Sequence, residues 1–361
     1  MRSAAKTHLQ AIGYLARPAG SGAEAGARTY CQVILQQAGF DTRHRRFEYS
    51  TFPGRWGTPL AGACLALLFL GTGLLGASGR PLDALALLLG GGAFIAACAR
   101  WLARYGVLDL PFGRLLGNNL ASTRGTPKLW LVAHLDSKSQ PIPIGVRAAA
   151  IIACIVLSVA AAASLLAQLL IGTSPAPLLG IMVLGIIAAL PVAASFVGDR
   201  SDGALDNASG LATVLRIVEL LPRTIELGVM LTTAEELGLA GARAWARESA
   251  PVSAINIDGI DDTGALRLVY SGRKPRMLLD YLGEGWPAAT PLPPGLLMDG
   301  VALADAGWDV VNVSKGSWRT VSRIHTPSDD LAHLEGSGIE EVASLLATSI
   351  IARTSAERRS Q

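Results

Sequence analysis

Four long apolar blocks constrain the fold of this 361-residue chain more than any other feature of its sequence. They are residues 60–77, 82–99, 148–171 and 176–197, which are 18, 18, 24 and 22 residues long. A helix needs about 20 apolar residues to cross the hydrocarbon core of a bilayer. Short links at 78–81 and 172–175 join the blocks in pairs. We therefore expect four transmembrane helices, arranged as two hairpins.

The alternative is that the blocks are buried hairpins of a large soluble core. Block 148–171 argues against it, because it has no charged residue and only Ser158, Ser164 and Gln168 as polar side chains. Pro191 is expected to kink the fourth block, which a membrane helix tolerates. Overall, 50% hydrophobic and 16% charged residues exclude a disordered chain. A scattered net charge of +3 excludes a nucleic-acid binder.

Basic residues beside the blocks indicate an orientation in the membrane. The outer ends of the two hairpins carry five arginines, which are Arg55, Arg100, Arg104, Arg147 and Arg200. The connecting links carry one, Arg80. Lysine and arginine are enriched on the cytoplasmic side of membrane helices. We therefore expect a multi-pass integral membrane protein whose remaining chain lies in the cytoplasm.

Outside the apolar blocks, segments with helical spacing alternate with segments typical of strands. Helices are expected at 21–38, 211–221 and 241–247, and strands at 42–49, 128–133, 225–232 and 252–257. Strands that alternate with helices indicate an α/β fold with a mixed, mostly parallel sheet and helices on both faces.

Carboxylates and histidines gather where the expected strands end. The residues in question are His134, Asp136, Glu235, Glu236, Asp258 and His325, with Asp206 at the start of an expected helix. Ligands of such sheets bind outside the carboxyl ends of the strands. The sequence thus predicts a functional site at that edge of the sheet.

Five of these residues form a plausible donor set for zinc: His134, Asp206, Glu236, Asp258 and His325. Imidazole nitrogen and carboxylate oxygen both suit zinc, and two metal ions about 3.5–4 Å apart need a carboxylate between them. The set is large enough for two zinc sites that share Asp206. Asp136 lies two residues after His134 and is expected to orient its ring through the other nitrogen.

Glu235 and Glu236 are adjacent, so in a regular strand they would point to opposite faces. The sequence EELG between a strand and a helix provides a turn that would let both serve one site. One glutamate would then bind metal while the other takes a proton from water.

Seven segments together resemble one family. They are RPAGSGAEAGARTYCQVILQQAGF, AHLDS, GALDNASG, TTAEELGLAGA, INIDG, DGVALADAGWDVVNVS and HTPSDD. In this order they resemble the co-catalytic zinc aminopeptidases, a family that includes bacterial secreted leucyl aminopeptidases, glutamate carboxypeptidase and glutaminyl cyclases. The segments cover nearly all of the chain outside the hairpins.

The resemblance implies a role for each residue. His134 and Asp258 would hold one zinc, Glu236 and His325 the other, and Asp206 would bridge them. Glu235 would be the general base, and the peptide bond between Asp206 and Asn207 would be cis. The implied protein is a di-zinc aminopeptidase anchored in a bacterial inner membrane. It would use metal-activated water to hydrolyse N-terminal residues of peptides. Because the second hairpin lies between two of the ligands, we expect membrane-associated peptides among its substrates.

The chain also departs from the family pattern. The second hairpin separates His134 from Asp206 by 72 residues, and residues 298–300 read Met-Asp-Gly where relatives have Ser-Asp-His. Ile324 stands where many relatives have an aromatic hydroxyl, which leaves Trp318, Arg319 and Arg323 as candidates for oxyanion stabilisation. Asp329 could orient a ligand or cap the helix that follows it, and capping is the expected role.

Two other functions remain open. HLDSK at 134–138 is compatible with a single-zinc glutaminyl-peptide cyclotransferase, although DNASG and TTAEELG look more like the hydrolases. The third alternative is a non-catalytic membrane binding protein with the same fold, which would have no need of the base Glu235.

The expected domain organisation follows from these assignments. Residues 1–58 begin the catalytic domain, 59–104 form the first transmembrane hairpin, and 105–144 return to the catalytic domain with the first zinc ligand. Residues 145–198 form the second hairpin, and 199–361 complete the catalytic domain.

Overall fold

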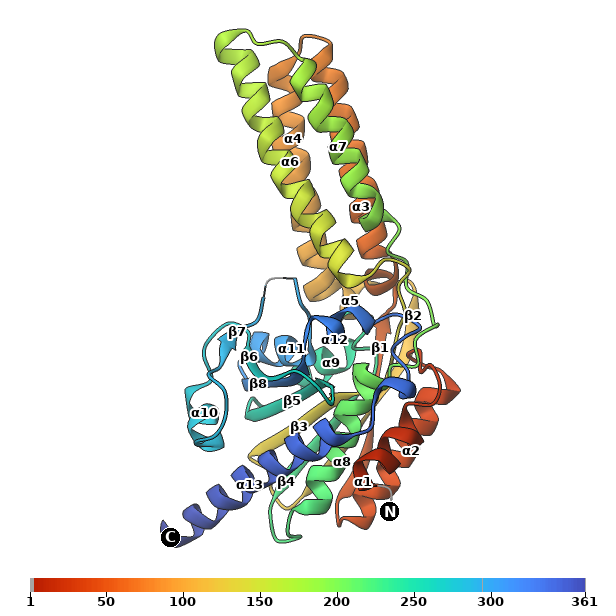
Figure 1. Cartoon of the computed structure of the whole chain (residues 1–361), viewed down its shortest axis with the longest axis vertical. Helices are drawn as coiled ribbons and strands as arrows, with labels where there is room; N and C mark the ends of the chain where they lie inside the picture. The colour runs from red at the N-terminus through yellow and green to blue at the C-terminus, as the bar shows by residue number, and fades with distance from the viewer. Residues whose placement is uncertain (1–2, 294, 361) are drawn as a thin grey trace. The chain divides into compact units, whose positions relative to one another are not determined.

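A computed structural model describes residues 3–293 and 295–360. The chain divides into two compact units, each of which is described by itself. The mixed-sheet unit comprises Met1–Tyr49, Arg114–Ser139 and Asp199–Gln361. The hairpin unit comprises Ser50–Gly113 and Gln140–Gly198 (Figure 1).

The hairpin unit consists of four long apolar helices. They are α3 (Phe52–Ala77), α4 (Pro81–Trp101), α6 (Ile144–Ile171) and α7 (Ala176–Ala193), with α4 continued by the π-helical turn η1 (Leu102–Gly106) and α5 (Val107–Asp109). All four are long and apolar enough to cross a membrane, which agrees with the two expected hairpins. The fourth helix ends at Ala193, two residues after Pro191, so this proline lies in its last turn.

Close contact between α3 and α7 depends on a glycine. A Cβ atom at Gly62 would lie 2.2 Å from the backbone nitrogen of Ala193, closer than any real Cβ contact. Small residues allow membrane helices to approach at this distance. The same helix carries Gly57, where a Cβ would have no neighbour within 4 Å.

We expect Gly62→Ala to destabilise the hairpin unit by about 1–3 kcal/mol, because the added methyl group forces the two backbones apart. Thermal unfolding of the detergent-solubilised chain measures the effect. Gly57→Ala, in the same helix, is the matched control and should unfold at or above the wild-type temperature, since alanine favours a helix. Equal unfolding temperatures for the two variants would contradict the close contact.

The mixed-sheet unit contains an eight-stranded sheet in the order β1-β2-β4-β3-β5-β8-β6-β7. The strands are β1 (Asp41–Ser50), β2 (Arg114–Arg124), β3 (Leu129–His134), β4 (Leu227–Thr232), β5 (Ser253–Ile260), β6 (Ala265–Tyr270), β7 (Thr290–Pro291) and β8 (Asp309–Gly316). The central strands β4, β3, β5 and β8 are parallel, whereas β2 and β6 pair with them antiparallel. The prediction of a mixed, mostly parallel sheet is confirmed.

Alternating side chains of the central strands enter two separate cores. Leu131 and Val229 join one core with helices α1 (Ala4–Ile12), α2 (Gly22–Gln37), α8 (Gly210–Leu220) and α13 (Ser337–Ser360). Val132 and Met230 join a second core with Trp245 of α9 (Ala240–Glu248) and Leu303 of α11 (Asp299–Asp305). Because successive residues of a strand point to opposite faces, the sheet has helices on both sides, as expected (Figure 1).

Four shorter elements complete the unit. They are η2 (Ala204–Ser209), α10 (Arg276–Leu282), α12 (Trp318–Arg323) and η3 (Leu331–His333). Of these, η2 and α12 carry or precede residues of the site described next.

Candidate metal centre

The predicted site residues come together at the carboxyl edge of the parallel strands. His134 is the last residue of β3, Asp258 lies near the end of β5, and the turn after β4 carries Glu235 and Glu236. Asp206 enters from η2, and His325 follows α12. All of these side chains are at most 12% exposed.

Asp206 lies between the two histidines. Its Oδ1 atom is 3.0 Å from Nε2 of His134, and its Oδ2 atom is 3.2 Å from Nε2 of His325. On the His134 side, Oδ1 of Asp258 is 3.6 Å from the same ring nitrogen. On the His325 side, Oε1 of Glu236 is 3.1 Å from the ring. Each half of the site therefore combines one imidazole with carboxylates, and Asp206 contributes one oxygen to each half.

The donor atoms fit metal ions in both halves. Donor atoms of His134, Glu235 and Asp258 lie within 4.8 Å of one another, and so do those of Asp206, Glu236 and His325. Nε2 of His134 and Oε1 of Glu236 are buried without a hydrogen-bond partner among the described residues. Buried polar atoms are normally paired, and a cation in each half would satisfy the unpaired atom there. The residue types suit zinc.

Asp136 contacts both His134 and the two glutamates. Nδ1 of His134 contacts the backbone oxygen of Asp136 at 3.0 Å, whereas the Asp136 carboxylate lies 3.8 Å away. That carboxylate accepts hydrogen bonds from the backbone N–H groups of Glu235 and Glu236, each at 3.1 Å. The peptide carbonyl of Asp136 is thus the nearer partner of the imidazole, and its side chain also shapes the glutamate turn.

The turn between Glu235 and Glu236 places the two carboxylates in different halves of the site. The preceding residue, Ala234, has a φ of 56°, so the strand pattern stops there. Burial, together with the negative charges of Glu236 and Asp299, raises the pKa of Glu235 well above its usual value. Burial also acts to raise the pKa of Glu236, but His325 and Lys138 outweigh it and lower that pKa to about 2.

Adjacent carboxyl groups whose pKa values shift in opposite directions are suited to different chemical roles. The lowered pKa keeps Glu236 ionised, as a metal ligand must be. The raised pKa makes Glu235 a better proton acceptor than an ordinary carboxylate. These directions match the roles that the resemblance implied for the two residues.

Hydrogen bonds to neighbouring backbone groups fix Asp206. The peptide bond from Asp206 to Asn207 is cis, as the resemblance implied. The Asp329 carboxylate accepts hydrogen bonds from the backbone N–H groups of Leu205 at 2.6 Å and Asp206 at 3.2 Å. The expectation that Asp329 caps the next helix is wrong, because the capping contact to Ala332 comes from Asp330. Asp329 instead holds the segment that carries Asp206.

The comparisons with known proteins agree with this arrangement. A protein-family model described as Peptidase family M28 matches residues 189–350. This part of the chain is therefore similar to peptidase family M28. The matched residues include Asp206, Glu235, Glu236, Asp258 and His325, while His134 and Asp136 lie before the matched segment. The sequence has no significant match among curated proteins.

Solved structures share the fold of this chain at low sequence identity. An aminopeptidase from Aneurinibacillus sp. strain AM-1 has a TM-score of 0.54 and 15% identity, over 96% of this chain and 92% of that one. The zinc aminopeptidase BSAP from Bacillus subtilis has a TM-score of 0.54 and 13% identity, over 96% and 94%. A glutaminyl cyclase from Porphyromonas gingivalis has a TM-score of 0.55 and 13% identity, over 98% and 99%.

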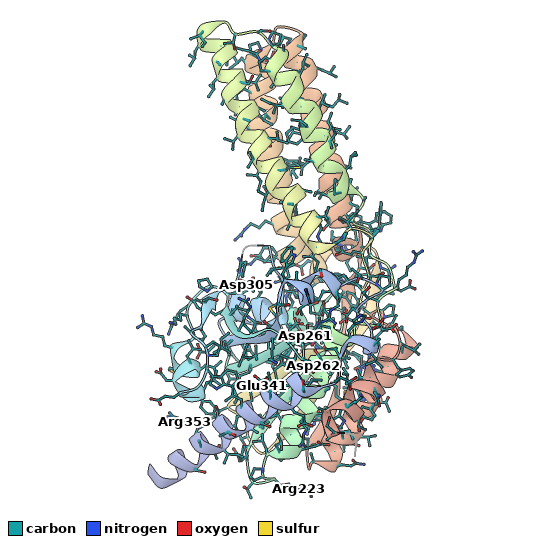
Figure 2. The ribbon with its side chains drawn as sticks, viewed as in Figure 1. Arg223, Asp261, Asp262, Asp305, Glu341 and Arg353 are labelled. Carbon is teal, nitrogen blue, oxygen red and sulfur yellow. The ribbon has the colours of Figure 1, made fainter. Side chains whose placement is uncertain are left out.

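Two neighbouring aspartates, Asp261 and Asp262, could compete with Asp258 as ligands, but both have other partners. Asp261 accepts hydrogen bonds from Thr320 at 2.6 Å and from Arg323, which it also pairs with electrostatically. Asp262 accepts from the backbone N–H of Gly338 at the start of α13. Both lie beside that helix (Figure 2).

The sequence reasoning did not assign a role to Lys138. Its Nζ atom lies 2.7 Å from Oε2 of Glu236, so each oxygen of this carboxylate has its own neighbour. The sequence feature that could have revealed it is HLDSK at 134–138, in which Lys138 lies in the same loop as His134. Of the three candidates for oxyanion stabilisation, Arg323 is engaged with Asp261, and Trp318 on α12 is 73% exposed.

Proposed function

We propose that this chain is a membrane-anchored di-zinc aminopeptidase that hydrolyses the N-terminal residues of peptides. The observation that carries the proposal is Asp206, whose two carboxylate oxygens face two histidines in two halves of one site. His134 and Asp258 would hold one zinc, and Glu236 and His325 the other, with Asp206 shared. The M28 match and the aminopeptidase structures support this reading.

Zinc bound at these positions would act as a Lewis acid on the scissile carbonyl and lower the pKa of a nearby water. Glu235 accepts the proton of the attacking water as the carbon–oxygen bond forms. It then gives that proton to the amine that leaves when the carbon–nitrogen bond breaks. Its raised pKa favours this proton return. Asp136, through its bonds to the backbone of Glu235 and Glu236, keeps both carboxylates in place.

We also propose that the four apolar helices span a membrane and that the mixed-sheet unit lies on the cytoplasmic side. The flanking arginines support this orientation. Residues 140–143 alone separate Ser139 from the start of α6 at Ile144, and four residues span at most about 14 Å. Because the loop that carries His134 is tied so closely to a membrane helix, we propose membrane-associated peptides as substrates.

The rival function is cyclisation of N-terminal glutamine. The HLDSK segment and the glutaminyl cyclases among the similar structures favour it. The two functions differ in metal content: the hydrolase reading requires two zinc ions per chain and the cyclase reading requires one.

We expect the purified full-length chain to contain two zinc ions by elemental analysis and to release N-terminal residues from unblocked peptides. Removal of zinc by a chelator should abolish the release, and added zinc should restore it. One zinc per chain with conversion of glutaminyl peptides to pyroglutamyl products would favour the cyclase instead. Equal turnover of soluble and membrane-partitioned peptides would remove the support for membrane-associated substrates.

A further inference from the structure

Two residues of the candidate metal centre come from segments that the second hairpin separates. His134 precedes the hairpin and Asp206 follows it, yet His134 Nε2 and Asp206 Oδ1 lie 3.0 Å apart. A short loop cannot set this distance, because residues 140–198 belong to the hairpin unit. Contacts within the mixed-sheet unit must hold the two segments together.

Arg17 provides these contacts from a third segment of the chain. Its side chain is buried, and its five side-chain hydrogen bonds all end on backbone carbonyl oxygens. Nε donates to Leu135, the residue after His134, at 2.9 Å. The two terminal nitrogens donate to Asp202 at 2.6 Å and to Gly203 at 2.9 Å, just before Asp206.

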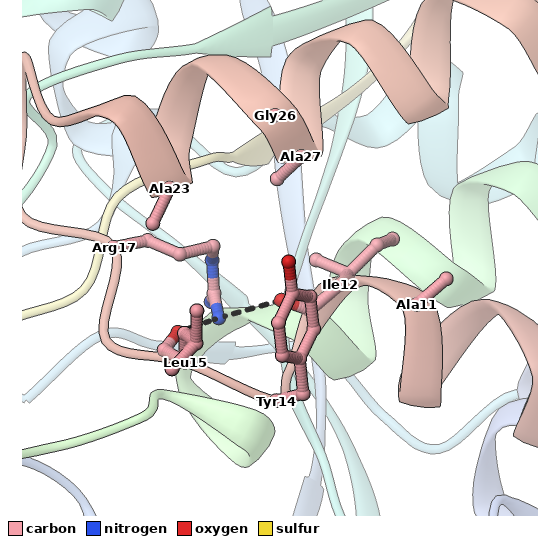
Figure 3. Close-up of a pocket in the computed structure, with 8 residues that line it drawn as sticks. All are labelled: Ala11, Ile12, Tyr14, Leu15, Arg17, Ala23, Gly26 and Ala27. Carbon is pink, nitrogen blue, oxygen red and sulfur yellow. Dashed lines mark hydrogen bonds between the residues drawn. The ribbon is translucent and has the colours of Figure 1, made fainter.

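The remaining contacts fix Arg17 itself. Its Nη1 atom also donates to the backbone oxygens of Ile12 at 3.2 Å and Leu15 at 3.4 Å. The side chain therefore turns back toward its own segment (Figure 3). The Arg17 backbone and Ser137 are joined twice, by Arg17 N–H to Ser137 Oγ and by Ser137 N–H to the Arg17 oxygen, each at 2.9 Å. Ser137 Oγ in turn donates to the Ser201 oxygen at 3.2 Å.

This geometry depends on arginine. A planar guanidinium presents five N–H groups in a fixed fork and can gather carbonyl groups from several directions at once. A lysine ammonium has three donors at a single point and cannot reach Leu135 and Gly203 together in the same way. The charge of Arg17 also interacts favourably with Asp329, Asp136 and Asp206 around the site.

We propose that Arg17 is the positioning residue that sets the spacing between His134 and Asp206, and thereby the affinity of the centre for zinc. This inference rests on the proposed function only in taking those two residues as zinc ligands. It requires no particular substrate and no peptidase activity.

The test is Arg17→Lys in the full-length chain, with zinc affinity measured by chelator competition in the absence of substrate. We expect zinc to bind about 10–100-fold more weakly, as is typical when groups that orient ligands are changed. The absorption spectrum of the Co²⁺-substituted variant should also differ from that of the wild type, because the spacing of the donor atoms changes.

The matched control is Arg124→Lys. Arg124 is also buried and also donates to backbone oxygens, those of Ile225 and Ala38, but it lies on β2 and binds neither ligand segment. This variant should lose a similar amount of thermal stability yet bind zinc within about threefold of the wild type. A folded Arg17→Lys variant with wild-type zinc affinity and Co²⁺ spectrum would overturn the proposal.

Ser137→Ala decides the question if Arg17→Lys does not fold. It removes the Ser137 hydroxyl bonds to Arg17 and Ser201 while the guanidinium stays. We expect a several-fold loss of zinc affinity, and unchanged affinity in this folded variant would contradict the proposal. A wild-type chain that binds zinc but hydrolyses no peptide would refute the aminopeptidase assignment and leave the role of Arg17 intact.

Discussion

Glu235→Gln should lower kcat/KM for peptide hydrolysis about 10³-fold while leaving the zinc content unchanged. The amide cannot accept the proton of the attacking water, and general acid–base groups typically contribute 10²–10⁴-fold. The Glu235 carboxylate is buried among other carboxylates, and a neutral amide is no more costly to bury there. Steady-state kinetics combined with elemental analysis of the same preparation measure both quantities.

Glu226→Gln is the matched control for this variant. Glu226 is exposed and directly precedes β4, so it lies at the opposite end of the strand that leads to Glu235. The control should keep wild-type kinetics and wild-type zinc content. If Glu235→Gln retained activity within tenfold of the wild type, Glu235 could not be the general base.

Asp206→Asn should weaken zinc binding in both halves of the site at once. The substitution removes the negative charge that faces His134 and His325, so neither half keeps its full donor set. We expect a loss of zinc affinity beyond the ~10–100-fold that changes to orienting groups cause, and a corresponding loss of hydrolysis. Chelator competition and elemental analysis of the purified variant check the result.

The control for Asp206→Asn is Asp199→Asn, an exposed aspartate at the start of the same segment. It should bind zinc like the wild type. A single zinc ion lost from Asp206→Asn, with the second bound at wild-type affinity, would show that the two halves do not share this carboxylate.

The patterns of apolar residues predicted the central sheet and its helices, because side chains that face the core must be apolar. Leu131 and Val132 enter different cores, and burial on both faces explains why this strand is a continuous apolar run in the sequence. The strand β2 was not predicted. It contains Asn119, a buried polar residue whose side chain bonds to the backbone of Thr233 and Gly241, so its pattern does not look like that of a strand.

The ligand set could be predicted because its residues follow strand ends within distinctive motifs. The orienting contacts could not. Asp136 and Asp329 bind backbone N–H groups of other loops, and the partners depend on how those loops fold rather than on the residue types. Arg17 belongs to a segment that carried the family resemblance, but nothing in that segment reveals which carbonyl groups the guanidinium reaches.

The hydrogen bond from the Arg200 backbone N–H to Ser139 Oγ, at 2.9 Å, joins the points where the chain leaves and re-enters the mixed-sheet unit. Residues 140–198 thus form a closed loop of 59 residues. Compared with a loop of about six residues, closing a flexible loop of that length would cost roughly 2 kcal/mol more in chain entropy. Since α6 and α7 pair as a hairpin, their own folding brings the loop ends together and removes most of that entropic cost. A helical hairpin can therefore be inserted between two residues of one site at little cost to the fold that holds them.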